Sequence, residues 1–276
     1  MEDIHLRLQV DLVWLTWIAF FIALPFYHFI RQRDPLIRWH EHGNVLTKPY
    51  GIWDLCGVVV FFMGMTALAS LGGEESAELT TNVLLTGSLM NIAIVCFFAM
   101  MWVWRKVDFV ELFGLARLNL AGVAIWGGVV GCISILLVMA VGLVSSSMLT
   151  PMLGELPPQP VVSAFLDSPD LAFRLIMLVT VVVVAPVFEE VMFRGYLYGV
   201  SKKFTDRFFA VVFSSSVFAL VHSGAITVVP IFTLALFLTL AYELTGCLLV
   251  PITIHMLFNL ANVLGMLFFP EAAAGS

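Results

Sequence analysis

Side chains that can take part in acid–base chemistry lie within apolar segments of this chain. Hydrolysis needs a base that activates water and hydrogen-bond donors that stabilise the tetrahedral oxyanion. A carboxylate can act as such a base, and imidazole and amide groups can act as such donors. The candidate residues, in chain order, are Glu189, Glu190, Arg194, His222, His255 and Asn259.

The spacing of the two glutamates and the arginine predicts different roles for them. Glu190 and Arg194 are four residues apart, so they share a helix face and can neutralise each other. This pair could also be only a clamp between helices. Glu189 is rotated by about 100° from Glu190 and has no partner on its own helix. Because an ionised group at mid-bilayer costs about 2.5–3.5 kcal/mol, a functional role for Glu189 is favoured.

The histidines and asparagines lie further along the chain. His255, Asn259 and Asn262 occupy one helix face, where polar side chains could also serve only to join membrane helices. His222 follows an apolar run, and a hydrogen-bonded imidazole at a helix end is the alternative interpretation there. Counted along their helices, Glu189, His222 and His255 fall at similar depth in the hydrocarbon zone, so a shared site is possible.

The composition indicates the element type that must position these residues. Only 13 Lys and Arg and 19 Asp and Glu occur among 276 residues, and hydrophobic types make up 61%. Soluble domains are about 45–50% apolar and about 25% charged. These values exclude a single water-soluble domain, a disordered chain and a nucleic-acid-binding surface. The sequence predicts an all-α, polytopic integral membrane helical bundle.

About eight transmembrane helices are predicted from the apolar segments. A Ser- and Pro-rich stretch, 145–169, separates an N-terminal membrane region of about four helices, 1–170, from a second membrane region, 171–270. The first span is interpreted as an anchor rather than a cleaved signal. The predicted spans are Leu12–Ile30, Ile52–Gly73, Leu79–Trp104, Leu120–Val144, Leu171–Val200, two within Phe208–Tyr242 that separate near His222, and Leu244–Pro270.

Lysine and arginine residues cluster in alternate loops, which predicts the orientation. By the positive-inside rule these loops are cytoplasmic and both termini are outside. The candidate site is then accessible from the cytoplasmic side, and we expect the membrane to be the cytoplasmic membrane of a prokaryote. Lys202 is assigned to one of these loops.

Three smaller features carry structural predictions. Asp54 and Glu243 lie near span ends, where exposure or a local cap would explain their charge. Gly127 and Gly131 form a small-xxx-small motif, which predicts close approach of another helix.

The polar motifs resemble a known family when taken in order. Glu189-Glu190-x-x-x-Arg194, Phe218-x-x-x-His222 and His255-x-x-x-Asn259 resemble the signature of the CPBP intramembrane proteases. This is the CAAX protease and bacteriocin-processing (ABI) family, which includes the type II CAAX prenyl proteases. The resemblance covers about Leu171–Phe269.

The resemblance implies an α-helical intramembrane endopeptidase and a role for each motif residue. It implies that Glu189 and His222 activate water and that Glu190 holds Arg194. It further implies that His255 and Asn259 stabilise the oxyanion.

Other interpretations of the same residues stay open. Two histidines and a glutamate could bind zinc with one open position. We favour catalysis without a metal or other cofactor, because there is no HExxH motif and the ligands would come from three helices. A non-catalytic membrane scaffold or immunity protein of the same fold is the alternative function, and a transporter or proton relay is a third. The expected partners are a peptide or membrane-protein substrate and the lipid bilayer; no sequence feature indicates a groove for a prenyl group or an oligomeric state.

Overall fold

The computed structural model describes residues 2–33, 43–71, 79–153, 164–166, 168, 170–222 and 226–268. Within these ranges the chain forms helices and no strand, which confirms the predicted all-α membrane bundle. The helices are α1 (Glu2–Arg33), α2 (Ile52–Leu71), α3 (Thr81–Trp104), α4 (Phe109–Leu112), α5 (Leu120–Leu153), α7 (Leu171–Val179), η2 (Thr180–Val184), α8 (Ala185–Glu189), η3 (Glu190–Tyr198), α9 (Gly199–Phe204), α10 (Arg207–Val221), α11 (Val228–Thr245) and α12 (Leu249–Phe268).

A helix occupies each of the predicted spans, including the two separated near His222. In the described part of the chain, six helices are long and apolar enough to cross a membrane. The other two predicted spans form shorter apolar helices, Ile52–Ala67 and Arg207–Val221. The 15 residues of α10 extend about 22 Å, less than the roughly 30 Å of a hydrocarbon core. A helix of this length that starts at one face of the membrane ends inside it.

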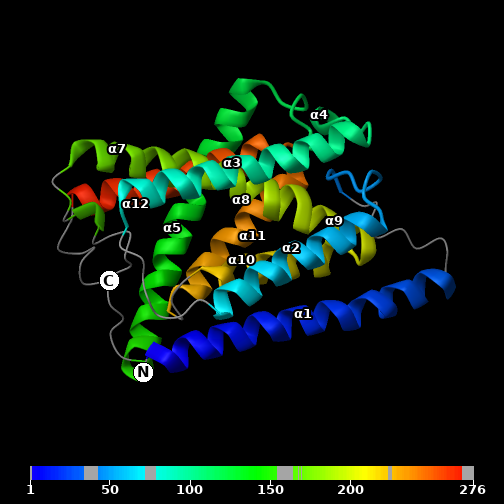
Figure 1. Cartoon of the computed structure of the whole chain (residues 1–276), viewed down its shortest axis with the longest axis horizontal. Helices are drawn as coiled ribbons and strands as arrows, with labels where there is room; N and C mark the ends of the chain where they lie inside the picture. Colours follow the sequence, from blue (N-terminus) through cyan, green and yellow to red (C-terminus); the bar gives the residue numbers. More distant parts are fainter. Residues whose placement is uncertain are drawn as a thin grey trace.

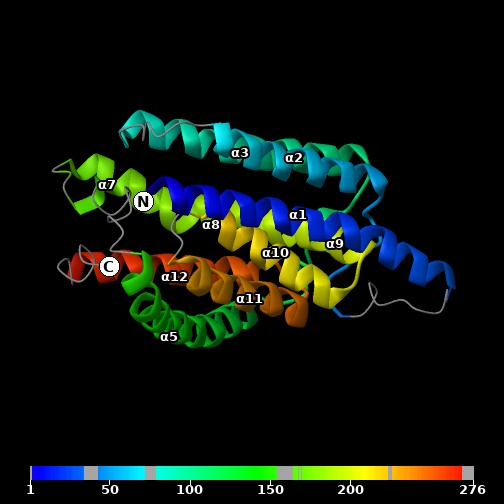
Figure 2. The same ribbon diagram turned by 90° about the horizontal axis from the view of Figure 1, so that it is seen from below.

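The helices pack in three layers, which Figure 2 shows most clearly. α2 and α3 form one outer layer, and α5, α11 and α12 form the other. Between them lie α1, α10 and the helical stretch from α7 to α9. α1 begins and α12 ends on the same side of the bundle, as termini on one side of the membrane require (Figure 1).

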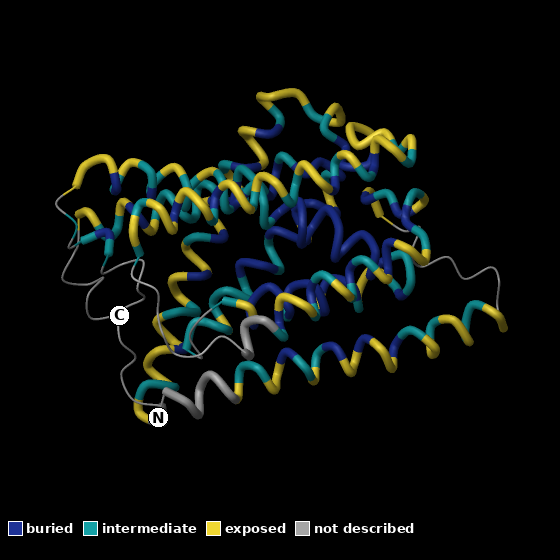
Figure 3. Tube along the Cα trace, in the orientation of Figure 1, coloured by how far each residue is buried: buried dark blue, intermediate teal, exposed yellow. Residues whose placement is uncertain are grey.

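Buried residues concentrate at the centre of the bundle, on residues 190–202 (Figure 3). The main hydrophobic cluster joins this segment to α1, α2, α3 and α10. It therefore contains residues from both sides of the predicted boundary near residue 170, and that division stays a prediction. Trp53 and Trp104, at the ends of α2 and α3, are strongly exposed, as is typical of aromatic residues at a membrane interface.

The predicted close approach at the glycine motif is confirmed. Gly127 and Gly131 lie on α5 against α12. A Cβ atom at Gly127 would lie 2.6 Å from the Cγ2 atom of Thr253, and one at Gly131 would lie 3.3 Å from the Cδ1 atom of Leu257. The two helix backbones can pack this closely because neither glycine has a side chain.

Three charged residues near the helix ends are buried, although exposure or a local cap is predicted for Asp54 and Glu243 and a loop position for Lys202. Asp54 is 1% exposed; it accepts a hydrogen bond from the Gly51 N–H, as a cap would, and also binds the guanidinium of Arg105. This hydrogen bond raises the pKa of Arg105. Glu243 is 4% exposed and accepts a 2.9 Å hydrogen bond from the Nζ atom of Lys202, which lies in α9 rather than in a loop. Burial is tolerated because each charge meets an opposite one, and the partners are too distant in sequence for a local pattern to reveal them.

Candidate active site

The helix that carries the glutamates is continuous from Leu171 to Phe204 but changes geometry along its length. It alternates between α-helical and π-helical segments, and Glu189 and Glu190 lie where α8 meets η3. π-Helical segments occur frequently at functional sites because they shift side chains out of the regular α-helical register.

The segment before the glutamates also positions Asn259. In the π-helical register of η2, the N–H of Ala185 donates to the carbonyl of Thr180. The next bond in this register would join residue 186 to the carbonyl of Val181, but Pro186 has no N–H. The Nδ2 atom of Asn259 donates to the Val181 oxygen instead, at 2.8 Å. Pro186 thus frees the carbonyl that holds the Asn259 side chain.

His222 lies where α10 ends. Its backbone is extended, with φ −87° and ψ 141°, so the helix stops at this residue. Its Nδ1 atom lies 2.6 Å from the carbonyl oxygen of Phe218, and because a carbonyl can only accept, Nδ1 carries the hydrogen. The Nε2 atom is therefore the one that faces Glu189.

Three helices converge on the carboxylate of Glu189. Its Oε2 atom lies 3.7 Å from the Nε2 atom of His222 and 3.7 Å from the Nε2 atom of His255. These contacts are longer than direct hydrogen bonds, so both imidazoles lie beside the carboxylate without bonding to it directly. The Glu189 side chain is 21% exposed, so it is partly accessible.

Glu190 forms a second, fully buried centre behind the first. Its Oε1 atom lies 2.9 Å from the NH1 atom of Arg194 and 2.8 Å from the Nδ1 atom of His255. Arg194 also donates to the carbonyl of Ala235 on α11, and its guanidinium lies 4.3 Å from the ring centre of Phe218. The pair is thus more than a clamp between two helices, because it also holds an imidazole that faces Glu189.

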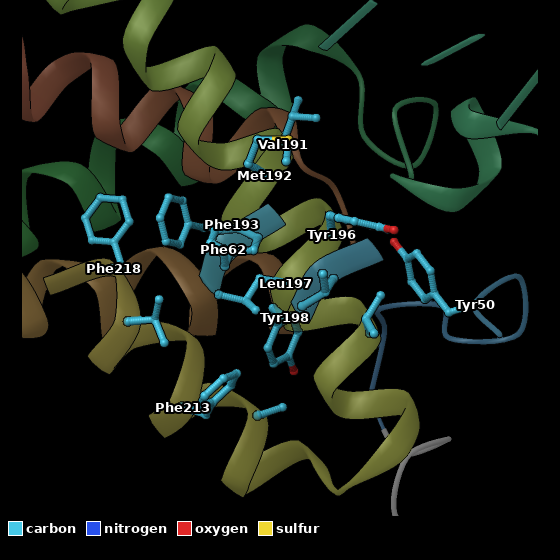
Figure 4. Packing of buried hydrophobic residues seen from close by; sticks show 14 of the residues in the cluster. Tyr50, Phe62, Val191, Met192, Phe193, Tyr196, Leu197, Tyr198, Phe213 and Phe218 are labelled. Atoms are coloured by element: carbon cyan, nitrogen blue, oxygen red, sulfur yellow. The ribbon is translucent and has the colours of Figure 1, made fainter. Parts of the chain in front are cut away.

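Aromatic residues enclose this second centre on the α10 side. The rings of Phe193 and Phe218 meet edge to face with centroids 4.9 Å apart, and Phe62 packs against Phe193 (Figure 4). Phe218 also contacts both histidines, with ring centroids 4.4 Å from His222 and 5.9 Å from His255. These apolar walls lower the local dielectric, which strengthens the polar contacts inside.

The structure links five of the six predicted residues directly and places the sixth, Asn259, one helical turn from His255. The contacts above link Glu189, Glu190, Arg194, His222 and His255. Asn259 lies on the same face of α12 as His255 and donates to the carbonyl of Val181, on the helix that carries the glutamates. Asn262 is exposed and lies away from these contacts. The contact between His255 and Glu190 joins residues 65 positions apart, so no local pattern in the sequence predicts it.

The two histidines and Glu189 are also the candidate ligands of a metal ion. In the part of the chain that the structure describes, no group of three or more His, Cys, Asp or Glu side chains has an arrangement that could hold a metal ion. The Nδ1 atoms of both histidines already make hydrogen bonds, which leaves their Nε2 atoms and the Glu189 carboxylate as the available donors.

The segment that carries the candidate site is similar to a known protein family. Residues 171–261 match the family described as type II CAAX prenyl endopeptidase, Rce1-like. Neither a curated protein nor a solved structure gives a significant match. The match contains all six site residues and confirms the resemblance to CAAX proteases; in a multi-pass membrane chain it supports an intramembrane protease. Residues 171–261 of this chain are thus similar to the Rce1-like type II CAAX prenyl endopeptidases.

Proposed function

We propose that this protein is an intramembrane endopeptidase in which Glu189 activates water for attack on a peptide bond. One observation carries the proposal: the Nε2 atoms of two histidines from two other helices lie at the same distance, 3.7 Å, from one oxygen of Glu189. A base with a proton acceptor or donor beside it is what the activation of water requires.

Burial assigns the two carboxylates to different roles. Glu189 is 21% exposed, whereas Glu190 is fully buried and is already bonded to Arg194 and His255. Only Glu189 is accessible to water and a substrate, so it takes the proton when water adds to the carbonyl carbon. The same proton then passes to the departing nitrogen as the C–N bond breaks. His222, whose Nε2 atom faces Glu189, orients the attacking water.

His255 and Asn259 stabilise the oxyanion in this proposal. The Asn259 amide uses one of its two hydrogens for the Val181 carbonyl and keeps the other for the substrate. The Nδ1–H of His255 donates to Glu190, so a hydrogen on Nε2 makes this ring an imidazolium. Glu189 and Glu190 together carry one more charge than Arg194 neutralises, and an imidazolium balances it. Such donors stabilise an oxyanion best when they are fixed in a dry site.

The proposed chemistry uses no metal, and the substrate is a peptide or a membrane-associated protein reached from the cytoplasmic side. A CAAX-type enzyme that cleaves prenylated C-termini is the more specific form of this proposal, because the matched family is named for that activity. Zinc bound by the Nε2 atoms of His222 and His255 is the competing mechanism, and its test is chelation.

The decisive experiment compares Glu189→Gln with the unaltered protein on peptide substrates with and without a prenyl group. The variant keeps the size of the side chain but removes the base, so cleavage should fall by at least about 10²-fold while membrane insertion and folding are unchanged. Glu111→Gln, at an exposed carboxylate on α4, is the control and should cleave normally. Full activity of Glu189→Gln would refute the proposal.

The alternative is a non-catalytic scaffold or immunity protein with the same fold. In that case a cellular phenotype of the protein would survive the simultaneous change of Glu189, His222 and His255. Comparing the membrane proteome of cells that carry either Glu189→Gln or the unaltered protein would reveal the substrate if the protein is a protease.

A further inference from the structure

We propose that Gln9, on the first helix, is a positioning residue that holds His222 in its orientation toward Glu189. The inference rests on the proposed function, because it assigns Gln9 a role in that site. The Nε2 atom of Gln9 donates to the carbonyl oxygen of Leu220 at 2.7 Å and also to the carbonyl oxygen of His222 itself. Gln9 lies outside the segment that matches the protease family.

The end of α10 needs such a partner because its last carbonyls have no partners within the helix. The carbonyl of Ala219 accepts the His222 N–H at 3.3 Å, and that of Phe218 accepts the imidazole Nδ1–H. The carbonyls of Leu220 and His222 are two further acceptors at this helix end, and an unsatisfied carbonyl at membrane depth costs several kcal/mol. The two amide hydrogens of Gln9 satisfy both oxygens at once.

These bonds act on the backbone of His222 and therefore on the direction of its ring. His222 is extended and lies just after the last residue of α10, so regular helix geometry does not fix its orientation. Its ring is tied to the backbone through the Phe218 carbonyl at one end and faces Glu189 at the other. A change in the backbone at His222 would move the Nε2 atom relative to the carboxylate.

Contacts along the rest of α1 fix the position of Gln9 along the axis of α10. The two helices run antiparallel and pack through aromatic residues: Phe20 stacks on Phe213 with centroids 4.4 Å apart, and Trp17 meets the same ring edge to face at 5.3 Å. At the opposite end of α10, the hydroxyl of Tyr27 donates to the carboxylate of Asp206. Figure 1 shows α1 running along the lower side of the bundle, below α2 and α10.

The test is a kinetic comparison of Gln9→Met with Tyr27→Phe in the full-length protein. Methionine has nearly the same shape as glutamine but donates no hydrogen bond, so His222 loses its anchor. We expect kcat to fall about 10-fold or more with KM within about 2-fold, because small misplacements of catalytic groups slow the chemical step. Tyr27→Phe breaks a polar bond between the same two helices at the far end and should keep kcat.

Further variants separate a failure of this inference from a failure of the proposed function. If His222→Ala abolishes cleavage and Gln9→Met retains full kcat, the positioning role is wrong while the proposed function stands. If His222→Ala remains active, the proposed function is wrong and the inference falls with it. Equal losses of kcat in Gln9→Met and Tyr27→Phe would show only a general loosening of α1 and would also overturn the inference. If Gln9→Met does not fold, Gln9→Asn, which is too short to reach both carbonyls, should give the same kcat loss.

Discussion

Replacing Pro186 by alanine should lower activity without lowering stability. In the structure, the missing N–H of Pro186 leaves the Val181 carbonyl free, and Asn259 donates to it at 2.8 Å. Pro186→Ala supplies an N–H that can bond to Val181 within the π-helical register. The Asn259 amide then loses its anchor and turns away from the position where it would meet the oxyanion.

The magnitude follows from the bond that is lost. A neutral intramolecular hydrogen bond contributes about 0.5–1.5 kcal/mol net. If that free energy holds Asn259 in its productive orientation, kcat should fall about 2- to 13-fold, since 1.4 kcal/mol corresponds to a factor of ten. Removing the donor altogether, as in Asn259→Ala, should cost about 10²–10³ in kcat. Alanine is up to about 3 kcal/mol more favourable than proline inside a helix, so the free energy of unfolding should stay equal or rise.

The assay is steady-state cleavage measured beside unfolding of the same preparations in detergent. Pro230→Ala is the matched control, because Pro230 lies in the first turn of α11, where a backbone N–H has no partner within the helix. Its kcat should be unchanged.

Two results would contradict this reasoning. In the Asn259→Ala background, Pro186→Ala should have no further effect on kcat; an additional loss there would mean that Pro186 acts by another route. An unchanged kcat in the single variant would show that the Val181 carbonyl does not orient Asn259.

Four other predictions concern the fold, the orientation and the cofactor. Lys202→Met leaves a buried carboxylate without its cation and should lower the free energy of unfolding by about 3–5 kcal/mol, whereas Lys203→Met, at a half-buried position, should change it by less than about 1 kcal/mol. Gly127→Leu should push α5 away from α12 and lower both stability and kcat, and Gly128→Leu, with open space at its Cβ position, should do neither. A reporter fused to the C-terminus should be extracytoplasmic, and a cytoplasmic signal would contradict the predicted orientation. Cleavage should survive strong chelation with no metal bound to the purified protein; loss of activity that zinc restores would support the zinc mechanism instead.

The local sequence predicted the helices and much of the site. Long apolar segments must become helices in a bilayer, because only a helix satisfies every backbone group within its own segment. For this reason the spans could be predicted from the apolar segments alone. The break at His222 was predicted for the same reason, since polar residues interrupt the apolar run there. The charged residues within the spans were few enough that each could be considered as a candidate for the site.

Ion pairs between residues far apart in the sequence could not be predicted from local patterns. Asp54 and Glu243 were expected to be exposed or to form local caps. Asp54 does cap the Gly51 N–H, but each carboxylate is also buried against a cation far away in the sequence. Their charge and position were visible in the sequence, but their partners lie 51 and 41 residues away. No periodicity relates such positions, because the distance between them depends on how the helices pack.

By itself, the sequence determined that this chain is a helical membrane bundle with a small set of polar residues held within its spans. It also determined that Glu190 and Arg194 can pair, because four residues make just over one helical turn. Only the tertiary structure decided that His255 contacts Glu190 through one nitrogen and faces Glu189 through the other. Only the tertiary structure, too, placed Gln9 of the first helix at the backbone of His222. These contacts join different helices, and their geometry depends on side-chain packing along the whole length of each helix rather than on any local pattern.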